Sequence, residues 1–315
     1  MKFAISSCWN SHRHDDGYAM LEELADLGFS YVELSHGTRI SLVPGILKGI
    51  EDGIVKVASV HNFCPLPVGV MGAAPNLFEP SAANRRERSM WLHNTIKTVE
   101  FANRVDCQRV VLHSGSMRFL WRHPERAMDE ALERASKEGA DPGDLESARQ
   151  RGLKRMKRSR KAYMDRLRES YGQIAEYGKQ QGVTFGIENR EGFTELPLDE
   201  EMSGFLDALK EHEVFGYWHD SGHAQLKQEM GLLDHGTFLN NLRPHLVGFH
   251  LHDVSSKGRD HQVPGTGTID WSIVAGQVRS GDVVVMEMSP RLNTEQIREG
   301  RDFLLRTIPA LAQEG

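Results

Sequence analysis

Eight short apolar runs of strand type recur along the chain, and helix-type stretches separate most of them. The runs are Lys2–Ser7, Tyr31–Leu34, Val55–His61, Arg109–His113, Val183–Glu188, Phe215–Asp220, Val247–His252 and Val283–Glu287. Their apolar residues are nearly continuous rather than alternating, which is typical of strands buried on both faces of a parallel sheet. Eight alternations of strand and helix therefore predict an α/β protein, a closed (β/α)8 TIM barrel rather than an open sheet.

The helices are predicted from apolar residues at helical spacing and from their end signals. One is expected near Val43–Glu51, and a shorter one around Phe238–Leu242 should end at Pro244. The last should cover Thr294–Leu311, with Thr294 as its N-cap. All 315 residues fit one barrel domain, residues 1–315, which is a usual size for this fold.

One interval, between the fourth and fifth strands, is too long for a simple barrel connection. Residues 125–146 carry eight acidic and three basic side chains, whereas residues 149–168 carry ten basic and one acidic. The segment Ala140–Asp144, with Pro142 and Gly143, separates the two. We expect residues 121–168 to be an inserted antiparallel helical hairpin whose arms pair with each other and face solvent. A lid, a dimer contact or a phosphate-binding arm is the alternative.

Composition limits the classes of function. The formal net charge of −6 gives no whole-molecule attraction to nucleic acid or to an anionic membrane. The cysteines Cys8, Cys64 and Cys107 are far apart, which favours a reducing, cytoplasmic location over a disulfide framework. The first residues resemble no secretory leader, and no apolar run is long enough for a membrane helix. Homo-oligomer formation stays open.

Each of the last four strands ends on or near a residue that commonly binds metals: Glu188, Asp220, His250 and Glu287. The carboxyl ends of barrel strands converge on one mouth, where the active site is built. Three carboxylates and an imidazole gathered there would repel one another unless a cation lay between them. The sequence therefore predicts a divalent metal site formed by these four residues.

Further polar residues follow the same strand ends and are candidates for a second metal or for substrate: His61, His113, His223, Asp260 and His261. Two neighbouring histidines, His219 and His252, are expected to point away from the mouth.

Two arginines and one turn are candidates for binding an anionic group. Arg118 and Arg190 follow strand ends and could bind a substrate phosphate or carboxylate. Residues 264–267, Pro-Gly-Thr-Gly, could bind phosphate through loop amides or could form a simple tight turn.

Taken together, these motifs resemble the xylose isomerase-like TIM barrel superfamily, which contains sugar phosphate isomerases, ketose 3-epimerases and endonuclease IV. The marks are Ser-Val-His61-Asn, Val-Leu-His113-Ser-Gly, Gly-Ile-Glu188-Asn, His-Asp220-Ser-Gly-His223-Ala, Gly-Phe-His250-Leu-His-Asp, Asp260-His261-Gln-Val-Pro-Gly-Thr-Gly and Val-Met-Glu287. The resemblance covers nearly the whole chain except the insertion.

The resemblance to the epimerases implies that Glu188, Asp220, His250 and Glu287 bind the metal and that Glu188 and Glu287 move the proton. Such an enzyme would isomerise or epimerise a sugar or sugar phosphate through a metal-stabilised enediolate. An oxygen-rich ligand set with one histidine favours Mn²⁺, with Zn²⁺, Co²⁺ and Mg²⁺ as alternatives.

Two other functional interpretations of the sequence stay open. In endonuclease IV, counterparts of His61, His113, His223 and His261 complete a multi-zinc phosphodiesterase site. Here Arg259 stands where an aspartate of that site is usual, with Asp260 next to it, and the acidic net charge disfavours a nucleic-acid substrate. A barrel that binds metal and ligand without turnover is the third reading.

Overall fold

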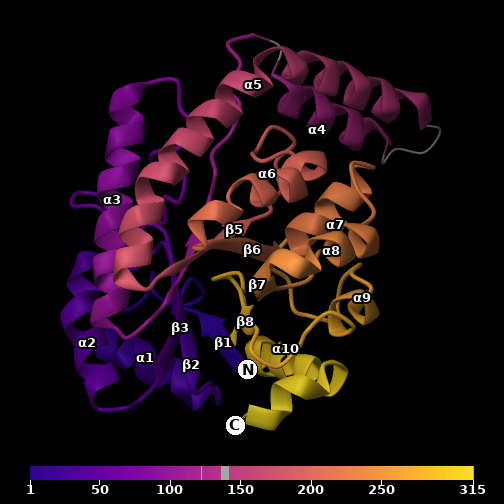
Figure 1. The fold of residues 1–315 in the computed structure, drawn as a ribbon. Coiled ribbons are helices and arrows are strands. Elements are labelled where there is room, and N and C mark those ends of the chain that lie inside the picture. The colour runs from indigo at the N-terminus through magenta and orange to yellow at the C-terminus, as the bar shows by residue number, and fades with distance from the viewer. Residues whose placement is uncertain (122, 136–141, 315) are drawn as a thin grey trace.

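The computed structural model describes residues 1–121, 123–135 and 142–314, and it confirms the predicted closed barrel (Figure 1). Neighbouring strands are parallel, and β8 returns to pair with β1, with Ala4 opposite Val285. The strands are β1 (Lys2–Ser6), β2 (Tyr31–Leu34), β3 (Lys56–His61), β4 (Arg109–Leu112), β5 (Thr184–Glu188), β6 (Phe215–Asp220), β7 (Leu246–Leu251) and β8 (Val283–Met286). All eight predicted runs are strands, within one residue at each end.

The α-helices that surround the barrel are α1 (Gly17–Asp26), α2 (Val43–Glu51), α3 (Arg85–Arg104), α4 (Pro124–Ala135), α5 (Pro142–Gln181), α6 (Met202–Ala208), α7 (Ser221–Glu229), α8 (His235–Leu242), α9 (Trp271–Ala275) and α10 (Thr294–Thr307). The predicted N-cap of α10 was wrong by one residue. Asn293 caps this helix and exchanges hydrogen bonds with Gln296 in a capping box, whereas the residue three positions after Thr294 is the apolar Ile297. Among the residues described, no helix is long and apolar enough to span a membrane.

A tryptophan fills the interior of the barrel. Trp218 of β6 is fully buried, and glycines stand beside it on both neighbouring strands. A Cβ on Gly248 would lie 2.2 Å from the indole Cζ3, and one on Gly186 would lie 2.7 Å from Cε3. Only glycine leaves room for the ring at these two positions. The indole also contacts the ring of His250 edge to face, with 5.2 Å between centroids, so it forms the floor of the barrel mouth.

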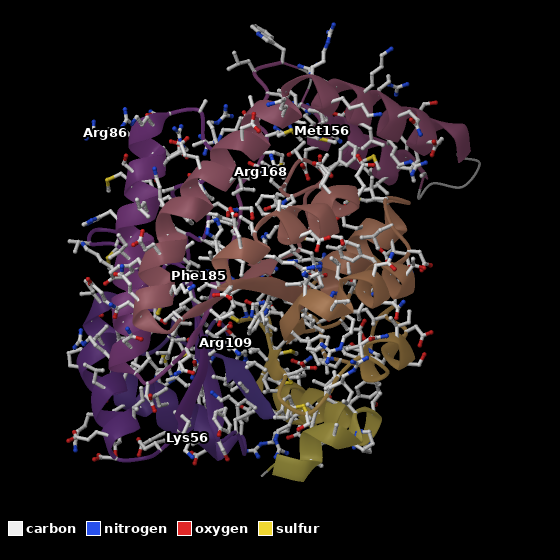
Figure 2. The ribbon with its side chains drawn as sticks, in the orientation of Figure 1. Lys56, Arg86, Arg109, Met156, Arg168 and Phe185 are labelled. Carbon is white, nitrogen blue, oxygen red and sulfur yellow. The ribbon has the colours of Figure 1, made fainter. Side chains whose placement is uncertain are left out.

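The inserted segment contributes α4 and the first half of α5, which pack against each other above the mouth (Figure 1). The second arm does not end near residue 168, because α5 continues to Gln181 as the barrel helix that precedes β5. Met156, buried in the first half of α5, lies at the opposite end of the molecule from Lys56 at the start of β3 (Figure 2). Residues 140 and 141 of the expected turn, Ala140–Asp144, lie outside the described residues, and its other three residues begin α5.

Specific contacts hold this pair of helices on the barrel. The carboxylate of Glu125 on α4 accepts hydrogen bonds from the amides of Phe193 and Thr194, at 2.7 and 2.9 Å, in the loop after β5. On α5, Arg160 pairs with Glu200 at 2.9 Å. Gly152 allows the ring of Phe193 to lie directly against α5. The two helices therefore form a roof over the mouth that is attached to the loops they cover.

Candidate metal centre

The structure brings the four strand-end residues to one point. One ligand atom each from Glu188, Asp220, His250 and Glu287 lies within 4.8 Å of the others. Nδ1 of His250 is central: it is 3.1 Å from Oε1 of Glu188, 3.2 Å from Oε2 of Glu287 and 4.0 Å from Oδ2 of Asp220. All four side chains are at least 95% buried. This cluster is called the four-ligand centre below.

Local structure fixes how each carboxylate enters the centre. Asp220 ends β6 and is also the N-cap of α7, because its Oδ1 accepts the amide of His223 at 2.7 Å. Its other oxygen, Oδ2, is left to face the centre. Asn189, directly after Glu188, joins β5 to β6: its Oδ1 accepts the amide of Asp220 at 2.7 Å, and its Nδ2 donates to the carbonyl of Asp220 at 3.0 Å.

Buried carboxylates dominate the electrostatics of the centre. Burial alone would raise the pKa of Glu188, but Arg190 and His113 outweigh it and hold that pKa well below its ordinary value. Burial alone would lower the pKa of His250, but the charges of Glu287 and Glu33 raise it well above its ordinary value. The buried carboxylates therefore favour a positive charge at this point. A divalent ion would supply that charge, since metal binding displaces protons from its ligands.

The donor set fits a borderline or hard divalent ion. Three carboxylates and one imidazole are the ligand types expected for Mn²⁺ or Zn²⁺, and both are compatible with a ligand position left for substrate. Trp218 contacts the ring of His250 on the side of the barrel interior. We therefore regard the four-ligand centre as a candidate metal centre.

A second group adjoins it on the side of β3 and β4. Nε2 of His113 lies 2.8 Å, and Nε2 of His61 3.4 Å, from Oε2 of Glu188. The other nitrogen of His113 contacts Oδ1 of Asn76 at 3.0 Å. Burial, followed by the charge of Arg190, lowers the pKa of His113 to about 4, so this imidazole is neutral at physiological pH.

A third group adjoins it on the side of β6 and β7. Nε2 of His223 lies 4.0 Å from Oδ2 of Asp260, and Nδ1 of His261 lies 2.8 Å from the same oxygen. Nε2 of His261 is 3.7 Å from Oε2 of Glu287. Asp260 therefore reaches both histidines, although Arg259 stands at the position where an endonuclease IV site was expected to have an aspartate. His261 has a φ of 52°, an uncommon conformation for a residue with a side chain.

The expectation that His252 points away from the mouth was wrong. Its Nδ1 accepts the amide of His261 at 2.9 Å, so its proton is on Nε2, which donates to Oδ2 of Asp220 at 3.0 Å. His252 stands two residues after His250, so the alternation of side chains along β7 already places both on the same face. His219 does point away, toward His235 at 3.1 Å.

Both arginines expected to bind an anion are paired with carboxylates of the protein. Arg118 contacts Glu87 at 2.7 Å and Glu79 at 3.0 Å. Arg190 contacts Glu195 at 3.1 Å and Glu188 at 3.5 Å.

The Pro264–Gly267 turn is also engaged within the protein. The amide of Gly265 donates to the buried carboxylate of Asp253 at 2.8 Å. A Cβ on Gly267 would lie 2.1 Å from the carbonyl oxygen of Val254. These contacts favour the tight turn over a phosphate-binding loop.

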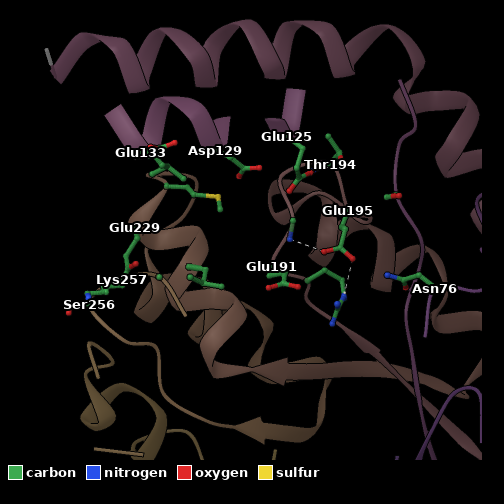
Figure 3. A pocket seen from close by; sticks show the side chains of 17 residues that line it. Asn76, Glu125, Asp129, Glu133, Glu191, Thr194, Glu195, Glu229, Ser256 and Lys257 are labelled. Carbon is green, nitrogen blue, oxygen red and sulfur yellow. Dashed lines mark hydrogen bonds and ion pairs between the residues drawn. The ribbon is translucent and has the colours of Figure 1, made fainter. Parts of the chain in front are cut away.

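A cavity of about 910 Å³ lies between the roof and the barrel mouth (Figure 3). It adjoins the four-ligand centre through Arg190 and Asn76, which line it and contact Glu188 and His113 respectively. Its charged lining is mostly acidic: Glu125, Asp129, Glu133, Glu191, Glu195 and Glu229, with Arg190 and Lys257. The acidic arm of the insertion thus faces this cavity, in contrast to the expected pairing of the two arms alone.

Sequence reasoning did not include Glu33, a fully buried carboxylate on β2 whose oxygens lie 3.0 and 3.1 Å from Nε2 of His250. The signal was present, since a charged residue stands near the end of the apolar run Tyr31–Leu34, as in the four later strands.

Comparison with known proteins agrees with this architecture. A family model described as the xylose isomerase-like TIM barrel matches residues 21–307. A D-tagatose 3-epimerase-like protein has a similar structure, with a TM-score of 0.68, 19% identity and coverage of 100% of this chain and 99% of its own. No curated protein sequence matches the chain.

Two further solved structures are similar. D-psicose 3-epimerase from Clostridium cellulolyticum H10 gives a TM-score of 0.67 at 14% identity, covering 98% of this chain and 99% of its own. A 3-keto-D-glucoside 4-epimerase from E. coli gives 0.63 at 13% identity, covering 97% and 99%. At these identities the similarity establishes the fold.

Proposed function

The chain belongs to the xylose isomerase-like TIM barrel family, and from that premise we propose that it is a metal-dependent isomerase or epimerase of a non-phosphorylated sugar or keto-polyol. The observation that carries the proposal is the four-ligand centre, in which two buried glutamates face one imidazole nitrogen beside a cavity large enough for a sugar. The similar structures act on ketoses and a keto-glucoside by their names.

Glu188, Asp220, His250 and Glu287 would hold the ion, with Mn²⁺ favoured by the oxygen-rich set. When bound, a divalent ion would polarise a substrate carbonyl and stabilise the negative charge left by deprotonation of the neighbouring carbon. The remaining chemistry belongs to the side chains.

Glu188 and Glu287 are the proposed proton carriers. Glu188 ends β5 and Glu287 follows β8, so they reach Nδ1 of His250 from strands on either side of β7, and each has a second imidazole beside it. His113 lies 2.8 Å from Glu188, and His261 lies 3.7 Å from Glu287. One carboxylate would remove a substrate proton and the other would return one to the opposite face, with the adjacent histidines holding the carboxylates in place.

The charges around the cavity support a substrate without a phosphate. Arg118 and Arg190 are already paired with glutamates, and the Gly265 amide is bound to Asp253. Carboxylates dominate the rest of the lining. A phosphate would meet net repulsion here, whereas sugar hydroxyls can donate hydrogen bonds to carboxylates.

The decisive experiment is conversion of a panel of ketoses and their phosphate esters in D₂O by the Mn²⁺-loaded protein, followed by NMR. We expect a neutral sugar to change configuration and to gain deuterium at the epimerised carbon. Glu188→Gln and Glu287→Gln should each lose epimerisation, and one of them should retain deuterium exchange on a single face. Conversion of phosphorylated sugars alone would contradict the proposed substrate class.

Elemental analysis separates this function from the phosphodiesterase alternative. We expect one tightly held ion per chain. About three zinc ions per chain together with cleavage of abasic DNA would refute the isomerase.

A further inference from the structure

Glu33 is a carboxylate residue in the fully buried interior of the barrel. It stands on β2, whereas His250 stands on β7, so the two side chains meet across the barrel and not between paired strands. Its side-chain contacts are Nε2 of His250, at 3.0 and 3.1 Å, and the hydroxyl of Ser59, which donates to Oε2 at 2.7 Å. Burying a carboxylate is unfavourable unless strong hydrogen bonds offset the lost hydration.

The two nitrogens of His250 face different partners. Among the described residues, the hydrogen-bond partner of Nε2 is the Glu33 carboxylate, whereas Nδ1 faces Glu188, Glu287 and Asp220. A neutral imidazole has one N–H. If Nε2 donates it to Glu33, the lone pair of Nδ1 points into the four-ligand centre. In the opposite tautomer, the Nε2 lone pair would face the Glu33 carboxylate and repel it. The proton would then be on Nδ1, where it would prevent this nitrogen from binding a metal.

We propose that Glu33 is the positioning residue that fixes the tautomer and ring orientation of His250, so that Nδ1 serves as a metal ligand. The inference rests on the proposed function, because it assigns Glu33 a role toward the proposed metal. A carboxylate that accepts the second N–H of a ligating histidine also increases the basicity of that ligand, and its loss typically lowers metal affinity 10- to 100-fold.

The test measures metal binding as well as turnover. Glu33→Gln keeps the shape of the side chain but removes its charge, and its amide group can donate to Nε2 and force the wrong tautomer. We expect its Mn²⁺ affinity, measured by competition with a fluorescent chelator, to fall by about 10- to 100-fold. Ser59→Ala, which leaves the Glu33 charge in place, should have a smaller effect.

Asp282→Asn is the matched control. Asp282 is also a buried carboxylate, paired with Arg243 at 3.1 Å, but it precedes β8 at the opposite end of the barrel from the centre. This variant should lose stability and keep the wild-type Mn²⁺ affinity. Unchanged Mn²⁺ affinity in Glu33→Gln would overturn the role of Glu33.

A second measurement needs no variant and remains decisive if Glu33→Gln does not fold. In the wild-type protein loaded with diamagnetic Zn²⁺, ¹⁵N NMR of the histidine side chains should show His250 with its proton on Nε2 and none on Nδ1. A proton on Nδ1 in the loaded protein would refute the proposal.

The outcomes also separate this inference from the proposed function. A wild-type protein that binds no divalent ion overturns both. Weaker Mn²⁺ binding in Glu33→Gln, in a protein that converts no sugar, supports the role of Glu33 and overturns the isomerase.

Discussion

Replacing Gly152 by alanine tests whether the roof is packed on the loop after β5. A Cβ at this position would lie 2.3 Å from Cε1 and 2.8 Å from Cζ of Phe193, a ring that is only 2% exposed. Alanine gains about 1 kcal/mol over glycine in helix propensity, whereas overpacking a filled site costs about 1–3 kcal/mol. Because the ring has no solvent to move into, we expect the clash to exceed the gain and the variant to be destabilised.

The matched control lies in the same helix. Apart from the adjacent residues and backbone of its own helix, no described atom lies within 4 Å of a Cβ built on Gly172, so Gly172→Ala should stabilise the protein by about 0.5–1 kcal/mol. Thermal unfolding should distinguish the two variants, since a stability change of about 1 kcal/mol shifts the melting temperature by roughly 2–4 °C in a chain of about this length.

Hydrogen exchange gives a local measure of the same contact. The amides of Phe193 and Thr194 donate to Glu125 on α4, so they should exchange faster in Gly152→Ala and at the wild-type rate in Gly172→Ala. An equal rise in melting temperature for both variants, with unchanged exchange, would refute the packing argument.

Three other predictions concern the site and the buried histidines. Glu188→Gln and Glu287→Gln should each lower kcat by about 10²- to 10⁴-fold with an unchanged circular dichroism spectrum, and near-wild-type turnover in either would exclude it as a proton carrier. Removal of the metal with a chelator should abolish turnover and lower the melting temperature, and Mn²⁺ at about 100 times its dissociation constant should restore about 2.7 kcal/mol; an unaffected melting temperature would argue against the centre. Burial lowers the pKa of His235 to about 4, below the ordinary 6.5, so the unfolded chain binds the extra proton between these values and the free energy of unfolding should fall as pH drops from 6.5 to 4. His235→Gln should reduce this change in the free energy of unfolding with pH, measured by urea titrations at several pH values. An unchanged pH dependence would mean that another group causes it.

The barrel was predictable from sequence because burial on both faces leaves a continuous apolar run at every strand. Runs such as Val183–Glu188 and Phe215–Asp220 carry this signal without any knowledge of their neighbours. Glu188, Asp220, His250 and Glu287 were identifiable for a related reason. A charged or imidazole side chain at the end of an otherwise apolar parallel strand has one favourable place to go, the barrel mouth.

The insertion was only half predictable. Its two blocks of charge indicated two helices, but charge alone does not show what a helix faces. The structure directs Glu125, Asp129 and Glu133 of the acidic arm toward the cavity, where Glu125 binds loop amides. It also continues the basic arm into the barrel helix up to Gln181, because no residue in the sequence ends the helix earlier.

Only the tertiary structure decided which partners meet across the barrel. The sequence shows a glutamate at position 33, but nothing local shows that it reaches Nε2 of His250, more than two hundred residues away. It shows Arg118 and Arg190 as free cations, yet folding pairs both with glutamates. Sequence patterns record whether a residue is buried and which end of its strand it occupies. The choice between neighbouring side chains depends on distances of 3–4 Å, which are set when the eight strands close into one barrel.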